Sequence, residues 1–215
     1  MKYIIKQNEP EDFTKWKALE NDEWTPSYDK LSGDVKNAVK KALMMEQGYI
    51  CCYCERRLTD NDSHIEHFRP QENKSTDPLD FSNMLCSCQQ RLKKGEPRHC
   101  GNLKDDWFDE LLLLSPLDPE CERRFAFTGD GYISSAQSTD KAATETVVRL
   151  GLDIPKLRSL RKFAIEPFLD DSLSQAEVTR FVSGYLQRDS GGMFGQFWTT
   201  IHYLFGGGET LSSNG

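Results

Sequence analysis

The sequence predicts an α+β protein, mainly helical, that is organised around one segment rich in metal ligands. Every cysteine except Cys121 and every histidine except His202 lies between residues 50 and 104. Outside this segment, apolar residues recur at intervals of three and four, the spacing that places them on one face of a helix. We therefore expect a helical scaffold around a short core that carries the cysteines and histidines.

The same observations divide the chain into four parts. Residues 1–48 are expected to form an N-terminal helical segment, and residues 49–107 the core with the cysteines and histidines. Residues 108–205 are expected to form a mostly helical region that offers a surface to a partner. The Gly/Ser-rich residues 206–215 are expected to form a disordered tail.

Length and composition bound the kind of protein. The 215 residues, 37% of them hydrophobic, are enough to bury a core in one globular unit or two small ones. The net charge of -7 argues against a surface that attracts nucleic acid throughout, although residues 91–94 and Arg98 form a local basic patch. No apolar run is long enough to span a bilayer. Seven cysteines without an export signal indicate the reducing cytoplasm.

The elements expected before residue 108 follow from local signals. One helix is expected after Pro10, with Asn8 as a possible cap, and a second from Asp34 to Gly48. The remaining elements are a cysteine turn at 49–58, a strand at 64–68 that Pro70 stops, a polar loop at 71–79 and a short helix at 101–107.

Beyond residue 108 the pattern becomes mostly helical. A Gly-Asp-Gly turn between apolar runs predicts a β-hairpin over residues 125–133. Helical spacing begins near residue 139, and Ser174 with Glu177 forms the capping-box pattern at the start of a later helix. Aromatic residues over the range 194–205 predict a last helix.

A structural zinc site is predicted from the cysteine spacing. Cys51 and Cys54 have the two-residue gap that lets both thiolates reach one tetrahedral ion. Cys88 and Cys100 are the best candidates for the second pair, because the basic loop between them can bulge outward. Four thiolates close the coordination shell and make the ion structural. The residues that compete for these positions are Cys52 and Cys86.

The segment His64-Ile65-Glu66-His67 carries the residue types that metal-assisted phosphodiester cleavage needs. A carboxylate such as Glu66 binds a hard cation, which clamps the scissile phosphate. A neutral histidine beside it takes a proton from the attacking water. On a strand, His64 and Glu66 would point to one side and His67 to the other.

The order of these motifs resembles the HNH endonucleases. The matching stretches are Cys-x-Tyr-Cys-Glu at 51–55, Glu-His-Phe-Arg-Pro at 66–70, Asn-Met-Leu at 83–85 and Cys-Gly-Asn-Leu-Lys at 100–104. More closely, the chain resembles the PtuB-type HNH proteins of Septu anti-phage systems and of related retron operons. The resemblance implies a zinc-stabilised ββα-metal nuclease core at 49–107, catalytic Mg²⁺ or Mn²⁺, and an ABC/SMC-like ATPase, PtuA, as partner.

The resemblance also implies a role for each matching residue. His67 would be the general base, Glu66 a metal ligand, and Asn83 the residue that orients the base and pins the loop. Gly101 stands where the family usually has a further Asn or His ligand. That ligand is left open among three candidates, of which the first is preferred: Asn102, His99 and His64.

Basic residues near these motifs are candidates for contacts with nucleic acid. Arg69 and Lys104 lie within the matching stretches, and either one is a phosphate contact or a plain surface charge. The basic loop between the second pair of cysteines adds three further candidates: Arg91, Lys93 and Lys94.

Two classes of function follow from these motifs. The first is an HNH endonuclease that serves as the effector of an anti-phage complex with a PtuA-like ATPase. Its substrate would be DNA, or tRNA or other RNA if the chain is linked to a retron, whose reverse transcriptase and msDNA would then join the complex. The second is a non-catalytic zinc module that bridges partners and makes Glu66 and His67 incidental.

Overall fold

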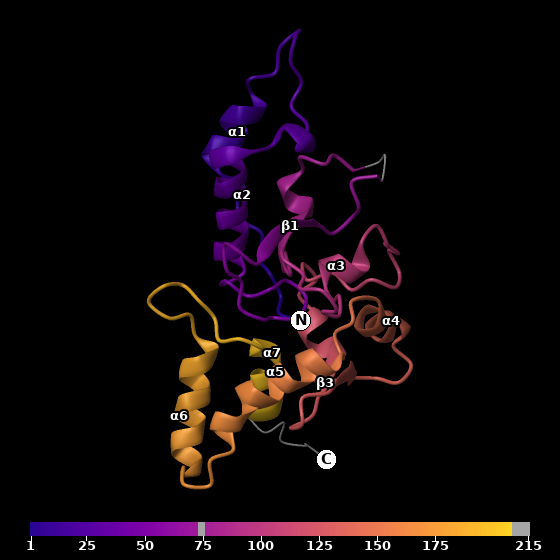
Figure 1. Ribbon diagram of the computed structural model, residues 1–215. Coiled ribbons are helices and arrows are strands. Elements are labelled where there is room, and N and C mark those ends of the chain that lie inside the picture. The colour runs from indigo at the N-terminus through magenta and orange to yellow at the C-terminus, as the bar shows by residue number, and fades with distance from the viewer. Residues whose placement is uncertain (73–75, 208–215) are drawn as a thin grey trace, which may run out of the picture.

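A computed structural model describes residues 1–72 and 76–207 (Figure 1). The helices and strands in chain order are α1 (Glu11–Lys17), α2 (Gly33–Glu46), β1 (Ser63–His67), β2 (Met84–Cys88), α3 (Gly101–Lys104), β3 (Phe125–Phe127), β4 (Ile133–Ser135), α4 (Lys141–Arg149), α5 (Pro155–Ile165), α6 (Gln175–Leu186) and α7 (Trp198–Phe205). Short 3-10 turns lie at Tyr28–Lys30, Phe81–Asn83, Cys121–Arg124 and Glu166–Phe168. Residues 208–215 of the tail expected to be disordered lie outside the described residues, as do residues 73–75 of the polar loop.

The first two helices are confirmed, but Asn8 does not cap the first, and the second begins at Gly33, one residue before the predicted start. Pro10 stands at the N-cap of α1, so Asn8 lies outside the helix and does not cap it. Ser32 stands at the N-cap of α2, and Asp34 lies within its first turn, where a negative charge complements the helix dipole. Gly48 follows α2 with a φ of +63°, as expected for a residue that terminates a helix.

β1 and β2 form an antiparallel pair in which Ser63 lies opposite Cys88. The amide of Gln47, just after α2, donates to the Cys86 carbonyl at 2.9 Å and accepts from the Cys86 amide at 2.7 Å. These two buried hydrogen bonds hold the end of α2 against β2. The central strand pair is thus fixed by a helix that precedes it in the chain.

α3 follows β2 after the basic loop and gives the strand–strand–helix order expected for the core. It spans 4 residues and is therefore shorter than the predicted helix at 101–107. Asp105 ends it by adopting a φ of +49°, which no α-helix continues. The order of elements is confirmed, whereas the identity of this core with a ββα-metal fold stays a prediction.

The hairpin expected at 125–133 is confirmed as β3 and β4, with Phe125 opposite Ser135. Its turn packs directly on α5. A Cβ atom on Gly131 would lie 2.2 Å from the Arg158 carbonyl oxygen, and the φ of +90° is one that glycine adopts without strain. The buried guanidinium of Arg161 donates to the Gly131 carbonyl at 3.0 Å, which fixes the turn to the helix.

The C-terminal helices form a second, smaller apolar cluster, centred on Ile165, Phe168, Val182 and Ile201. The capping box of Ser174 and Glu177 is confirmed at the start of α6. α7 begins at Trp198, later than the predicted start, because Phe197 has a left-handed φ of 53°. Within the described ranges, no helix combines the length and the apolar character needed to cross a membrane.

The larger apolar core crosses the expected boundary at residue 107. It joins Leu43 of α2 and Leu85 of β2 to Phe125 of β3 and Leu157 of α5. Figure 1 shows α1 and α2 at one end of the molecule and α5, α6 and α7 at the other, with β1 and α3 between them and β3 beside α5. The division into 1–48, 49–107 and 108–205 stays a prediction.

Candidate active site

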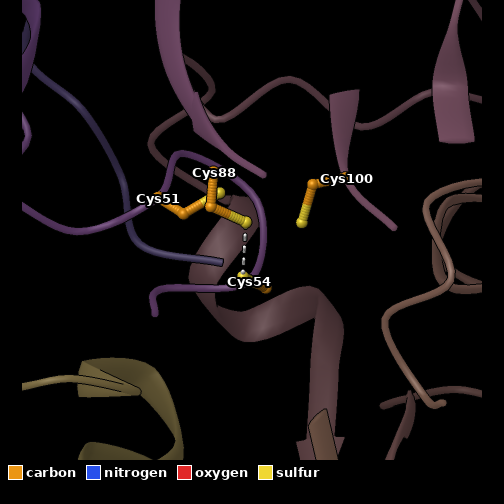
Figure 2. A group of neighbouring side chains, drawn as sticks. All are labelled: Cys51, Cys54, Cys88 and Cys100. Carbon is orange, nitrogen blue, oxygen red and sulfur yellow. Dashed lines mark hydrogen bonds between the residues drawn. The ribbon is translucent and has the colours of Figure 1, made fainter. Parts of the chain in front are cut away.

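The four cysteines predicted to bind zinc meet in one buried cluster, which Figure 2 shows with the sulfur atoms turned toward one another. Their sulfur atoms all lie within 4.8 Å of one another. Cys51 and Cys54 come from the turn after α2, which a bridge between Ile50 and Arg57 closes. Cys88 is the last residue of β2, and Cys100 directly precedes α3.

The geometry of this cluster fits a tetrahedral zinc ion. Zn–S bonds of about 2.3 Å at tetrahedral angles place the sulfur atoms about 3.8 Å apart. The sulfur atoms of Cys54 and Cys88 are 3.7 Å apart. Burial raises the pKa of the Cys51 thiol, but its hydrogen bonds to Cys100 and the other cluster thiols bring that pKa well below its usual value. Burial and the hydrogen bond to Cys51 raise the pKa of Cys100, so the thiolate, which is the form that binds metal, is favoured at Cys51 and not at every member of the cluster.

The remaining cysteines do not enter this cluster. Cys52 and Cys86 are buried but fall outside the group of four, and Cys121 donates to the Met1 carbonyl at 3.4 Å. All of the cysteines are free thiols. Of the residues that competed for the zinc positions, the geometry therefore selects the four first predicted.

A second, open site lies along β1. A pocket of about 280 Å³ is bordered by His64, Glu66 and His67 of β1, by Gln71 after it, and by Gly101 of α3. Strict alternation along the strand would turn His67 to the face opposite His64 and Glu66. It nevertheless borders the same pocket, because it is the last residue of the strand.

Glu66 is the best-held side chain in this pocket. Its Oε1 atom accepts a hydrogen bond from the Tyr53 hydroxyl at 3.1 Å and pairs with the Lys104 ammonium at 3.1 Å. Its Oε2 atom faces His64 Nε2 at 3.6 Å. Burial raises the pKa of the Glu66 carboxyl, but His64 and Lys104 outweigh this effect and lower the pKa overall. Glu66 is therefore an anion at neutral pH.

His67 has the hydrogen bonds of an oriented base. Its Nε2 lies 2.9 Å from the Pro78 carbonyl oxygen, and since a carbonyl only accepts, Nε2 carries the proton. Nδ1 is then the basic nitrogen, and the Gln71 amide nitrogen lies 3.2 Å from it. Burial lowers the pKa of the His67 imidazole, which keeps it neutral at physiological pH. Tyr28 packs edge-on against the ring at 4.6 Å.

Asn83 pins the loop that follows β1, as the resemblance implies. Its Oδ1 accepts from the Arg69 amide at 2.8 Å, and its Nδ2 donates to the Arg69 carbonyl at 2.9 Å. The Asn83 carbonyl also accepts from the Phe68 amide at 3.0 Å. Asn83 therefore fixes the backbone directly after His67 and does not itself border the pocket.

The candidates for the further metal ligand fall in different places. Asn102 borders the pocket, and its amide nitrogen donates to the Gln89 carbonyl at 2.5 Å, a bond that does not use Oδ1, the atom that would bind a metal. His99 is fully buried beside the thiol cluster, with Nδ1 at 3.1 Å from Cys100 Sγ. Only His64 directs a ring nitrogen toward Glu66.

The basic residues expected to contact nucleic acid also lie in different environments. Lys104 is 2% exposed, and its ammonium binds Glu66 and the His67 and Asp105 carbonyls, which leaves it no free donor for a phosphate. Arg69 is half-exposed and pairs with Glu110 at 3.1 Å. Three further candidates are exposed in the loop after β2: Arg91, Lys93 and Lys94.

The sequence did not predict that three residues take part in this pocket. Tyr53 lies between two cysteines, yet its hydroxyl reaches Glu66. Gln71 sits in a polar loop, yet its amide faces the basic nitrogen of His67. Arg98, counted in the basic patch, borders the pocket itself. Each depends on how distant segments fold together, and spacing within one motif does not reveal that.

Comparison with known proteins identifies a relative of this chain. No family model matches the chain. A protein of Vibrio cholerae serotype O1 biovar El Tor, named "Retron Vc95 putative HNH endonuclease", is 31% identical to this chain over 139 residues. The match covers 61% of this chain and 65% of that relative, slightly less than two thirds of its length. This relationship confirms the predicted resemblance to HNH endonucleases of the retron-associated type.

Proposed function

We propose that the protein is a metal-dependent endonuclease that hydrolyses phosphodiester bonds in nucleic acid. The observation that carries this proposal is the orientation of His67. Its Nε2 is fixed on the Pro78 carbonyl at 2.9 Å, which leaves Nδ1 as the basic nitrogen, and His67 and Glu66 line the same pocket. A neutral base beside a metal-binding anion is the arrangement that phosphodiester hydrolysis requires.

Each residue of the pocket has a part in this reaction. His67 Nδ1 takes a proton from the water that attacks the phosphorus, and the water takes the place of the Gln71 amide. The Pro78 carbonyl stabilises the imidazolium that forms, because it accepts the Nε2 proton in both states. Lys104 and Tyr53 hold one oxygen of Glu66 in place, and Asn83 holds the backbone after His67.

The donors present fit two kinds of metal ion. The thiol cluster fits a structural zinc ion and leaves no position for substrate. The pocket with Glu66 fits a divalent cation such as Mg²⁺ or Mn²⁺, which when bound stabilises charge on the phosphate and on the leaving oxygen. Glu66 is the ligand that both the sequence and the geometry support.

The charge of the protein bears on its substrate and partners. With a net charge of -7, it attracts nucleic acid weakly on its own, and a partner is needed to deliver the substrate. We propose a PtuA-like ATPase for this role within an anti-phage complex, joined by a reverse transcriptase and msDNA if the chain is retron-linked, as the name of its relative suggests. The substrate is then DNA, or tRNA or another RNA.

The second candidate function is a zinc module that bridges partners without catalysis. The buried thiol cluster supports it as well as it supports an enzyme. The arrangement of His67, Gln71 and Pro78 has no part in such a module, and for this reason we prefer the endonuclease.

A cleavage assay separates the two. The protein, with any ATPase encoded beside it, is offered DNA and total RNA side by side with Mg²⁺ or Mn²⁺. We expect wild-type protein to cut one of them and His67→Ala to cut neither, with zinc content unchanged. Equal cutting by both proteins would contradict the catalytic role of His67 and favour the bridging module.

A further inference from the structure

We propose that His64 and Glu66 together hold the divalent cation of this pocket, and that Gly101 keeps the space for it open. The inference deepens the proposed endonuclease function and rests on it for its biological meaning. It assigns the ligand that the sequence left open among three residues. It also specifies the kind of ion, because an imidazole and a carboxylate form a mixed nitrogen and oxygen donor set.

The first observation is the distance between the two side chains. His64 Nε2 and Glu66 Oε2 are 3.6 Å apart, which is too far for a direct hydrogen bond. Metal–nitrogen and metal–oxygen bonds of about 2.1 Å each reach across such a distance with an ion between them. Residues two apart on a strand point to the same face, so β1 alone sets this pair.

The second observation is that Glu66 has one oxygen held and one available. Tyr53 and Lys104 both bind Oε1, each at 3.1 Å, whereas Oε2 has only His64 as a neighbour among these contacts. Partners that bind one oxygen fix the orientation of the other, as second-layer hydrogen bonds do around metal ligands. The carboxylate is thus oriented with its available oxygen toward the imidazole.

The third observation is the absence of a side chain at residue 101. A Cβ atom on Gly101 would lie 2.3 Å from Glu66 Oε2 and 2.9 Å from His64 Nε2. Any larger residue would therefore push into the space between the two donor atoms. The α3 position closest to the pair is occupied by the one residue that leaves that space open.

The other two candidates are placed differently. Asn102 also borders the pocket, but its amide nitrogen is held by the Gln89 carbonyl on the loop after β2, and His99 lies beside Cys100 in the thiol cluster. Within the described part of the chain, no third His, Cys, Asp or Glu joins this pair in a compact ligand group. The pair therefore leaves coordination positions open for water and a phosphate oxygen, which is the mark of a catalytic site.

The mixed donor set predicts a preference among ions. Mg²⁺ strongly prefers oxygen ligands, whereas transition ions accept imidazole. We therefore expect Mn²⁺ to bind this pocket more tightly than Mg²⁺, with His64 as the source of the difference.

The test uses Mn²⁺ binding to the full chain, followed by electron paramagnetic resonance. Wild type is compared with His64→Ala, Gly101→Ala and the matched control Asn102→Ala, each checked for zinc content and thermal unfolding. We expect His64→Ala to weaken Mn²⁺ binding at least about tenfold, since even indirect partners of metal ligands have effects of this size. Gly101→Ala should weaken it as well, and Asn102→Ala should change it less than about twofold.

A spectroscopic signature distinguishes a ligand from a residue that only supports the fold. Bound Mn²⁺ should show coupling to an imidazole nitrogen in wild type, and this coupling should vanish in His64→Ala. If His64→Ala keeps both the affinity and the coupling, or if Asn102→Ala loses as much affinity as His64→Ala, the assignment is wrong.

Cleavage by the same preparations keeps the two proposals apart. If His67→Ala abolishes cutting while His64→Ala binds Mn²⁺ normally, the endonuclease stands and the ligand assignment fails. If His64 governs Mn²⁺ binding but no preparation cuts nucleic acid, the metal site stands and the endonuclease fails.

Discussion

The thiol cluster and the pocket lie on the same short stretch of chain but are built in opposite ways. The cluster has four identical donors, all buried, and no room for another ligand. The pocket has chemically different donors, His64 and Glu66, and opens to solvent. A closed set of ligands holds segments together, whereas an incomplete set leaves places for substrate. The difference agrees with the structural role proposed for the first site and the reactive role proposed for the second.

The two sites are also connected. Cys88 ends β2 and Cys100 precedes α3, so a metal ion in the cluster holds the strand and the helix that border the pocket. The Ser87 hydroxyl accepts from the Gly101 amide at 3.2 Å, which links β2 directly to the pocket. The cluster thus sets the position of Gly101 opposite Glu66.

Removing a cluster ligand should have the largest effect. We expect Cys54→Ser to lose zinc and to lower the free energy of unfolding by more than about 4 kcal/mol, because the metal contributes to folding directly. Zinc content and thermal unfolding measure this. Cys121→Ala is the matched control, since it removes a buried thiol outside the cluster and should cost about 1 kcal/mol with zinc retained. Equal losses in both variants would remove the distinction between the two kinds of cysteine.

Removing the base should affect the pocket alone. We expect His67→Ala to slow cleavage by about 10² to 10⁴-fold, the usual contribution of general base catalysis, with the zinc content and the fold unchanged. Initial rates on the cleaved substrate give the measurement. His202→Ala is the control, because this exposed histidine on α7 stacks on Trp198 and lies far from the pocket in sequence. Unfolding of His67→Ala would mean that the two sites are not separable.

Removing the side chain of Asn83 should lower both the stability and the cleavage rate to a moderate degree. Asn83→Ala loses two hydrogen bonds to the Arg69 backbone, for a cost of about 1–3 kcal/mol. We expect the cleavage rate to fall as well, because the backbone after His67 is released. Asn83→Asp keeps the acceptor for the Arg69 amide but sets a carboxylate oxygen against the Arg69 carbonyl, so it should lose at least as much stability. Denaturant unfolding together with rates tests this, and an unchanged rate in a destabilised Asn83→Ala would contradict a role in positioning His67.

The smallest effect is expected for the substitution of Arg69. Arg69→Ala breaks an exposed ion pair with Glu110, which contributes less than about 1 kcal/mol to stability. If Arg69 contacts a phosphate, the salt dependence of nucleic-acid binding should fall by about one charge. Binding isotherms at several salt concentrations measure the slope. Glu110→Gln, which frees Arg69, should leave the slope unchanged or raise it; a lower slope would argue against the contact.

The sequence predicted the parts of this comparison that are local. A two-residue gap between Cys51 and Cys54 predicts a turn, and alternation at residues 64–66 places two side chains on one face. Both features depend on neighbouring residues and not on the rest of the chain. The hairpin at 125–133 and the capping box of Ser174 are local in the same sense, and both are confirmed.

The parts that were not predicted depend on tertiary contacts. Lys104 was a candidate phosphate contact, but α3 folds against β1 and places its ammonium on Glu66. Asn102 was preferred as a ligand, and this role stays a prediction; the hydrogen bond from its amide nitrogen to the Gln89 carbonyl was not predicted. The cap expected at Asn8 was displaced because Pro10, with its fixed φ, starts the helix itself.

One contact described by none of these motifs limits how far the molecule can be shortened. Glu55, the neighbour of Cys54, accepts the Thr199 backbone amide at the start of α7 at 2.7 Å and is also bonded by the Thr199 hydroxyl. The Glu55 carbonyl accepts from Phe197 at 3.0 Å. A chain cut at residue 107 would leave this buried carboxylate with the Met1 ammonium as its remaining partner among these contacts. An engineer who wants a minimal module must therefore keep α7 or replace Glu55.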